Sequence, residues 1–91
     1  MRFKIVFSKR FVKHYQKAPK KVQQKFNERI IIFENNQYDE RLRSHFLAGE
    51  WAGCKSIDIT GDWRAVYEKL ENGLIEWVEF VEIGTHSQLY G

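Results

Sequence analysis

Hydrophobic and polar residues alternate at the start of the chain. Phe3, Ile5 and Phe7 fall on one face of residues 2–7, and Lys4 falls on the other. A period of two is typical of a half-buried β-strand. The sequence therefore predicts that the chain opens with a strand.

Two helices are predicted next. Apolar residues recur at helical spacing over residues 8–18, and Ser8 is a good N-cap for this segment. Pro19 ends this helix at Ala18 and suits the first turn of a second helix. The second helix is expected over residues 20–34, with an apolar stripe formed by Val22, Phe26, Ile30 and Phe33.

The second half of the chain predicts three strands. After a connecting segment at residues 37–53, alternation over residues 56–60 indicates a strand, and Gly61-Asp62 marks the turn to a return strand at residues 63–67. Asn72-Gly73 is a strong hairpin signal.

The last strand and the chain end complete the pattern. Residues 74–83 are apolar on both faces, which is typical of a largely buried strand. Residues 84–91 are too short to predict another full element. The order β-α-α-β-β-β predicts one α+β domain over residues 1–91, in which two N-terminal helices pack on one face of an antiparallel sheet that the first strand joins.

The net charge of +3 conceals a split between the two parts of the chain. Residues 1–33 carry ten basic side chains and one acid, hence +9, whereas residues 34–91 carry five basic and eleven acidic side chains, hence −6. Such asymmetry indicates a polyanionic or strongly charged partner.

Composition excludes several classes of protein. A single cysteine, Cys54, rules out an intramolecular disulfide framework and cysteine-based zinc sites, and it fits a reduced, cytoplasmic compartment in which the thiol is inert. No apolar run approaches the length of a membrane span, and the first residues lack the features of a signal peptide. Phosphate-loop and dinucleotide-binding motifs are absent. Among the histidines, His14 is expected on a solvated helix face with the neighbouring lysines.

Two segments resemble a known family. Residues 45–67, which read HFLAGEWAGCKSIDITGDWRAVY, and residues 83–90, which read IGTHSQLY, look like the RelE/ParE superfamily of toxins, and the YafQ-like branch above all. Both motifs occur in order and at the separation typical of that superfamily, whose fold has the element order predicted above.

The resemblance implies a toxin of a type II toxin–antitoxin system. Such proteins are ribosome-dependent mRNA endonucleases that need no metal or cofactor, and a cognate antitoxin restrains them. The ribose 2′-hydroxyl attacks the adjacent phosphate, which requires a base, a positive charge for the transition state and an acid for the leaving oxygen. The resemblance places the site at His45, Asp58, Asp62, Arg64, His86 and Tyr90.

Within that site, the resemblance assigns individual roles. His86 is the candidate general acid, Arg64 is the phosphate-binding arginine, and Tyr90 is the terminal aromatic residue that stacks on a base or orients the phosphate. Two positions depart from the family pattern. Asp58 stands where relatives carry histidine or lysine, and Glu82 stands where YafQ-like relatives carry arginine.

Other interpretations remain open. The chain could be a ParE-like toxin that inhibits DNA gyrase by protein contact, or a degenerate member that only binds. His45, Asp62, His86 and Tyr90 favour the nuclease. Docking on the ribosome is expected through Trp63 and the lysines of the helical half, which lies away from the proposed site: Lys9, Lys13, Lys17, Lys20, Lys21 and Lys25. Those lysines could instead form a solvated face or an antitoxin seat.

Overall fold

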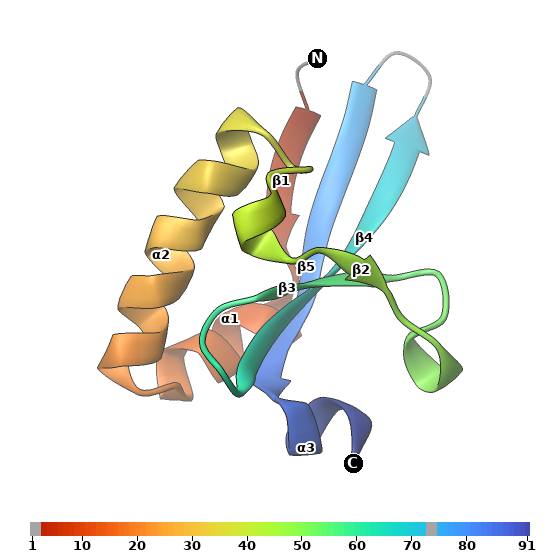
Figure 1. Cartoon of the computed structure of the whole chain (residues 1–91). Helices are drawn as coiled ribbons and strands as arrows, with labels where there is room; N and C mark the ends of the chain where they lie inside the picture. Colours follow the sequence, from red (N-terminus) through yellow and green to blue (C-terminus); the bar gives the residue numbers. More distant parts are fainter. Residues whose placement is uncertain (1–2, 73–74) are drawn as a thin grey trace.

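The computed structural model describes residues 3–72 and 75–91. The elements follow the predicted order, with additions in two places (Figure 1). Their bounds are β1 Phe3–Phe7, α1 Lys9–Lys17, α2 Lys20–Asn35, η1 Glu40–Leu42, β2 His45–Phe46, η2 Gly49–Trp51, β3 Lys55–Asp58, β4 Trp63–Asn72, β5 Ile75–Thr85 and α3 His86–Tyr90. None of the helices described is long and apolar enough to cross a membrane.

The strands form one five-stranded sheet in the order β1-β5-β4-β3-β2. The predicted antiparallel meander of β3, β4 and β5 is confirmed, although Gly73 of the predicted hairpin turn lies outside the described residues. The prediction of a wholly antiparallel sheet is wrong, because β1 runs parallel to β5 from Phe3↔Glu76 to Phe7↔Phe80. Alternation reads the same in both directions, so it could not fix the direction of β1.

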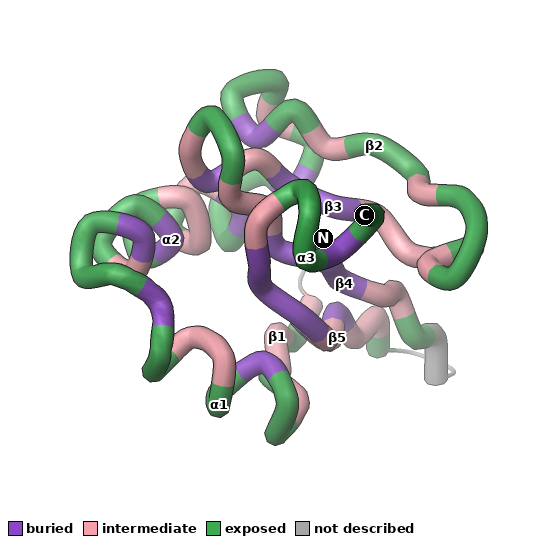
Figure 2. Tube along the Cα trace, turned by 90° about the horizontal axis from the view of Figure 1, so that it is seen from below, coloured by how far each residue is buried: buried purple, intermediate pink, exposed green. Residues whose placement is uncertain are grey.

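The helices begin and end close to the predicted residues. The Ser8 side chain accepts a hydrogen bond from the Phe11 N–H and so caps α1. Phe11 of α1 and Phe26 of α2 pack with Phe80 of β5, whose ring lies 5.9 and 5.5 Å from theirs. Figure 2 shows buried stretches of β3, β4 and β5 at the centre of the view, with α1 and α2 beside them and exposed along the outer edge.

Two segments have more structure than predicted. The connecting segment contains η1, the short strand β2 and η2, and β2 pairs with β3 through His45↔Ser56. The chain end forms α3 because Thr85 and Gln88 make a reciprocal capping box, which satisfies backbone donors at the start of a very short helix.

Candidate active site

The sheet register brings the predicted catalytic residues to one end of the sheet. Asp58, the last residue of β3, pairs with Arg64 on β4, and Arg64 pairs with Gly84 on β5. His86 follows Gly84 by two residues and opens α3. Three strands therefore deliver polar residues to one place from positions that are far apart in the sequence.

Arg64 is held by the turn between β3 and β4. Its Nε donates to Asp58 Oδ1 at 2.9 Å, and its terminal nitrogens donate to the carbonyl oxygens of Thr60, Gly61 and Trp63 at 3.0–3.3 Å. The side chain is only 17 % exposed. In this conformation the guanidinium braces the turn, a role that the sequence did not reveal.

His45 lies on β2 with both ring nitrogens near polar partners. Nδ1 lies 2.9 Å from the Arg43 carbonyl oxygen, and Nε2 lies 3.4 Å from the Ser56 hydroxyl. A carbonyl oxygen can only accept, so Nδ1 carries the proton and Nε2 of the neutral ring carries the lone pair. That lone pair faces the Ser56 hydroxyl, whose hydrogen can rotate to another direction, and the His45 side chain is exposed, so a substrate can reach Nε2.

The segment before His45 is anchored to the core. Ser44 Oγ and the phenol of Tyr67 on β4 share a 2.6 Å hydrogen bond, and Tyr67 is buried. Burial raises the pKa of Tyr67. The contact fixes the backbone that carries both His45 and Arg43.

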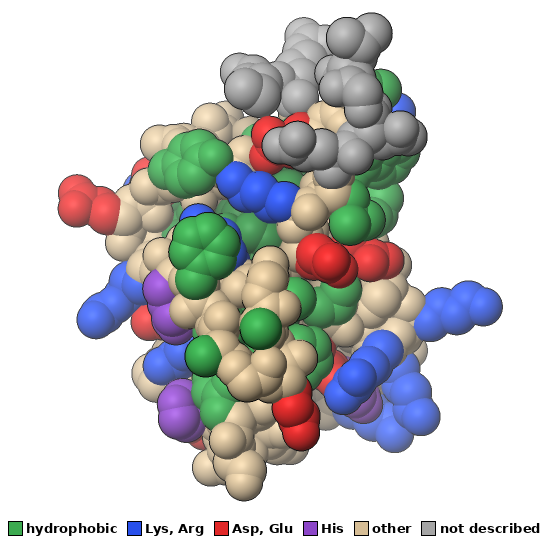
Figure 3. Space-filling model, turned by 90° about the vertical axis from the view of Figure 1, so that its right-hand side faces the viewer, with side chains coloured by type: hydrophobic (Ala, Val, Ile, Leu, Met, Phe, Trp, Pro, Cys, Tyr) green, Lys and Arg blue, Asp and Glu red, His purple; other side chains and the backbone are tan. Residues whose placement is uncertain are grey.

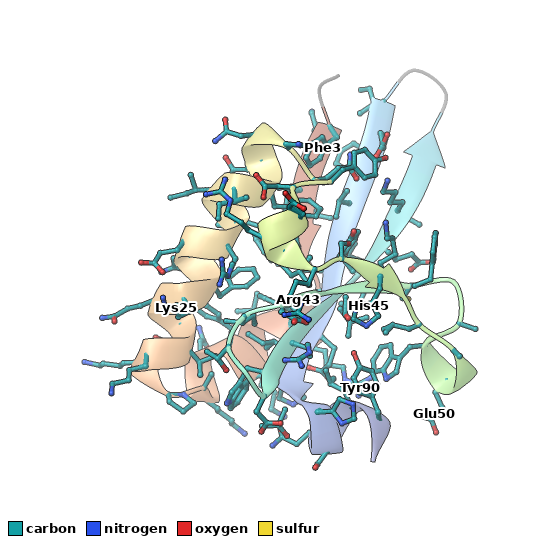
Figure 4. The ribbon with its side chains drawn as sticks, in the orientation of Figure 1. Phe3, Lys25, Arg43, His45, Glu50 and Tyr90 are labelled. Carbon is teal, nitrogen blue, oxygen red and sulfur yellow. The ribbon has the colours of Figure 1, made fainter. Side chains whose placement is uncertain are left out.

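Arg43 is a site residue that sequence reasoning missed. It adopts the left-handed conformation with φ 51°, and its Nε lies 3.5 Å from Asp58 Oδ2. Most of its side chain is exposed. Figure 4 shows Arg43 and His45 near β3, with Tyr90 on α3 below them in that view. A basic residue two positions before His45 was the available signal.

His86 and Tyr90 form one unit on α3. Their rings meet edge to face with centres 4.8 Å apart, as residues four apart on a helix can. The His86 N–H donates to the Asp62 carbonyl oxygen at 2.9 Å, so Asp62 contributes its backbone here while its side chain is exposed. The Trp51 indole donates to the Leu89 carbonyl oxygen at 2.9 Å and joins η2 to α3.

Glu82 is the buried charge beside this site. It is 3 % exposed, and its carboxylate accepts hydrogen bonds from Arg10 Nε, His14 Nδ1 and the Ile83 N–H. His14 is therefore paired with a carboxylate, and the expectation of a merely solvated His14 is wrong. Beyond the end of β1, α1 takes the place beside β5, which is why its side chains reach Glu82.

A cavity of about 350 Å³ lies next to that pair. Arg10, His14 and Lys17 line one side, and Trp63 and Gln88 line another. None of the six predicted catalytic residues lines this cavity, although α1 of the helical half and Trp63, the neighbour of Arg64, border it. Among the described residues, no three His, Cys, Asp or Glu side chains are arranged to hold a metal ion.

Comparison with known proteins identifies the family of the chain. The family model of the bacterial toxin of type II toxin–antitoxin systems, YafQ, matches residues 3–91. The chain belongs to the YafQ toxin family. A search of curated proteins found no match.

Solved structures of YafQ and RelE toxins share this fold. A mutant of YafQ from E. coli has a TM-score of 0.79 at 22% identity, with 98% of this chain and 99% of that chain covered. YafQ in the E. coli DinJ-YafQ complex has a TM-score of 0.76 at 23% identity, with both chains fully covered. The archaeal RelE-RelB complex from Pyrococcus horikoshii has a TM-score of 0.72 at 21% identity, with 97% and 99% covered.

The basic residues of this YafQ-family toxin are divided between solvent and the cavity. Lys17 lines the cavity, and Trp63 lines it too while packing against the core. Lys25 pairs with Glu28 at 3.4 Å. The lysines of α1 and α2 are all exposed: Lys9, Lys13, Lys17, Lys20, Lys21 and Lys25.

Proposed function

We propose that this YafQ-family toxin is an endoribonuclease that cuts mRNA on the ribosome. The observation that carries the proposal is the row Asp58–Arg64–Gly84 across β3, β4 and β5, which brings the His45 and His86 segments to the same end of the sheet. Two imidazoles and the arginine side chains by Asp58 are groups of the kind that 2′-hydroxyl attack on a phosphate requires.

The proposed roles follow from the contacts. His45 Nε2 removes the proton of the 2′-hydroxyl, whose oxygen then attacks the adjacent phosphorus. His86 donates a proton to the 5′-oxygen as its bond to phosphorus breaks, which leaves a 2′,3′-cyclic phosphate and a 5′-hydroxyl. Arg43, the most exposed guanidinium beside Asp58, offsets the charge of the phosphorane-like transition state. Tyr90 stacks on a base.

In this mechanism Asp58 and Asp62 position other site residues and do not react themselves. Asp58 accepts from Arg64 and faces Arg43, so it positions arginines. The Asp62 carbonyl oxygen holds the start of α3, and with it His86. Arg64 contributes by bracing the turn between these two aspartates and adds positive charge at short range.

Mapping of mRNA 5′ ends after induction in cells tests this function. Cuts inside translated reading frames, bearing 5′-hydroxyl ends and absent from a matched message without a start codon, are expected. Intact messages together with a DNA-damage response would favour inhibition of gyrase and overturn the nuclease. Intact messages with normal growth would favour a binding module.

We also propose that a cognate antitoxin restrains this toxin. An apolar groove of about 380 Å³ between α1 and α2 supports this, because Phe7 and Val12 remain partly exposed there beside Phe11, Tyr15 and Ile30. Such a groove fits the apolar face of an amphipathic helix. Co-expression of the cognate antitoxin should restore growth, and Val12→Glu should prevent that rescue while Lys9→Glu should not.

A further inference from the structure

Four side chains from four segments meet on a surface separate from the cavity. Tyr38 follows α2, Phe46 lies on β2, Lys55 on β3 and Lys69 on β4. Lys55 Nζ lies 4.9 Å from the ring centre of Phe46 and 5.6 Å from that of Tyr38. Lys69 Nζ lies 4.6 Å from the ring centre of Tyr38 and donates to its hydroxyl at 2.8 Å. We call these four residues the aromatic–lysine surface.

The two rings of this surface are unusually exposed. Phe46 is 74 % exposed and Tyr38 is 65 % exposed, whereas four phenylalanines are buried in the core: Phe11, Phe26, Phe33 and Phe80. Figure 3 shows hydrophobic side chains with basic ones between them in the upper left of that face, and histidines below them. An aromatic ring left in water forgoes the free energy of burial, which a stacked ligand would recover.

The charge of the surface favours an anionic ligand. Lys69 lies 3.8 Å from Glu76, so one carboxylate partly offsets one ammonium. Within the described part of the chain, the ion pairs include none to Lys55. The surface thus keeps a net positive charge directly beside two π-faces, the combination by which proteins bind single-stranded nucleic acid.

We propose that the aromatic–lysine surface binds single-stranded RNA by stacking two bases on Tyr38 and Phe46 while Lys55 and Lys69 contact phosphates. Unpaired bases offer free faces to such rings, whereas the bases of a duplex are stacked on one another. His45 and Phe46 are adjacent on β2, so their side chains point to opposite faces of the sheet. Because β2 is the edge strand, an RNA strand engaged at His45 reaches this surface by crossing that one edge. The inference rests on the proposed function in that the bound strand is the proposed substrate.

Fluorescence anisotropy with a labelled ten-nucleotide RNA, 2′-O-methylated throughout so that it resists cleavage, tests the inference on the purified chain. Phe46→Ala and Tyr38→Ala should each weaken binding by about 5- to 100-fold, in line with the strength of base–aromatic stacking. Phe46→Trp and Tyr38→Phe should retain binding. Lys55→Gln should lower the slope of log affinity against log salt by about 1.

Matched variants separate stacking from nonspecific effects. Ile31→Ala removes an exposed apolar side chain on α2, away from the aromatic–lysine surface, so it should leave the affinity for RNA unchanged. Phe46→Leu keeps an apolar side chain without a π-face and should bind as weakly as Phe46→Ala. Equal affinity for Phe46→Leu and the parent, or for single-stranded and duplex RNA, would overturn the proposal.

Three further outcomes are distinct. Loss of antitoxin binding in Phe46→Ala with unchanged RNA binding would assign the surface to a protein partner and overturn the RNA proposal. Strong, Phe46-dependent RNA binding by a chain that cuts no message in cells would support this surface and contradict the proposed endonuclease. If the chain cuts messages in cells and its affinity for RNA does not depend on Phe46 or Tyr38, the proposed endonuclease is supported and the proposal for this surface is contradicted.

Discussion

Arg10 on α1 donates from its Nε to the carboxylate of Glu82 on β5, and so links the basic half of the chain to the acidic half. Glu82 is almost fully buried, whereas most of the Arg10 side chain is exposed. His14 and the Ile83 N–H complete the set of donors. The negative charge at position 82 is thus compensated within the protein.

This pairing predicts the effect of removing Arg10. Arg10→Gln should lower the free energy of unfolding by about 1–2 kcal/mol, because a buried carboxylate loses a charged partner while solvent screens the exposed arginine. The double variant Arg10→Gln/Glu82→Gln should recover most of that loss, since no buried charge remains. Urea denaturation measures both, with Lys9→Gln as the matched surface control. Equal destabilisation in the single and double variants would contradict the pairing.

His86 is predicted to be essential for toxicity. His86→Ala should abolish growth inhibition on induction while leaving the unfolding midpoint nearly unchanged, because the ring is exposed and the capping of α3 depends on Thr85 and Gln88. Ser87→Ala, at the neighbouring exposed position of α3, should remain toxic. Full toxicity of His86→Ala would remove this histidine from the proposed mechanism.

The fold was predictable where local pattern decides. Ser8, Pro19 and the apolar stripe from Val22 to Phe33 place both long helices correctly, because caps and periodicity are local signals. The direction of β1 depends on its pairing with the distant strand β5, which no local pattern encodes. The start of α3, by contrast, has a local signal, the capping-box pattern from Thr85 to Gln88, and the Trp51–Leu89 hydrogen bond adds a distant contact.

The sequence predicted which residues form the candidate site better than it predicted the contacts that they make. The motifs contain His45, His86 and Tyr90. They do not show that the guanidinium of Arg64 donates its hydrogen bonds to carbonyl oxygens of the β3–β4 turn. Arg10 lies more than seventy residues from Glu82 in the sequence, so only the packing of α1 against β5 discloses their contact.

The lysines of α1 and α2 are predicted to dock on ribosomal RNA. Replacing Lys9, Lys13 and Lys20 with Glu should weaken co-sedimentation with ribosomes, and binding of the parent should fall steeply with salt because phosphate contacts release counterions. These three lie outside the cavity and the Lys25–Glu28 pair, so the site is left intact. Binding that is insensitive to both charge reversal and salt would show that these lysines form only a solvated face.

Asp39 begins the segment that carries Arg43 and His45, and its carboxyl is predicted to stay ionised well below the usual pH for an aspartate. Asp39 caps η1 and accepts from the Arg41 backbone and guanidinium at 2.8–3.0 Å, and these bonds lower the pKa of Asp39 to about 2. A carboxyl whose folded pKa lies below its unfolded value near 3.8 adds stability above that value, and the contribution is lost as the pH falls through about 2. NMR titration of the Asp39 carboxyl should therefore show a midpoint near 2. In Arg41→Gln the midpoint should rise toward 3.8, because the largest cause of the shift is the Arg41 side chain, whereas Lys25→Gln should leave it unchanged. A midpoint near 3.8 in the parent would mean that the Asp39–Arg41 contact does not persist in solution.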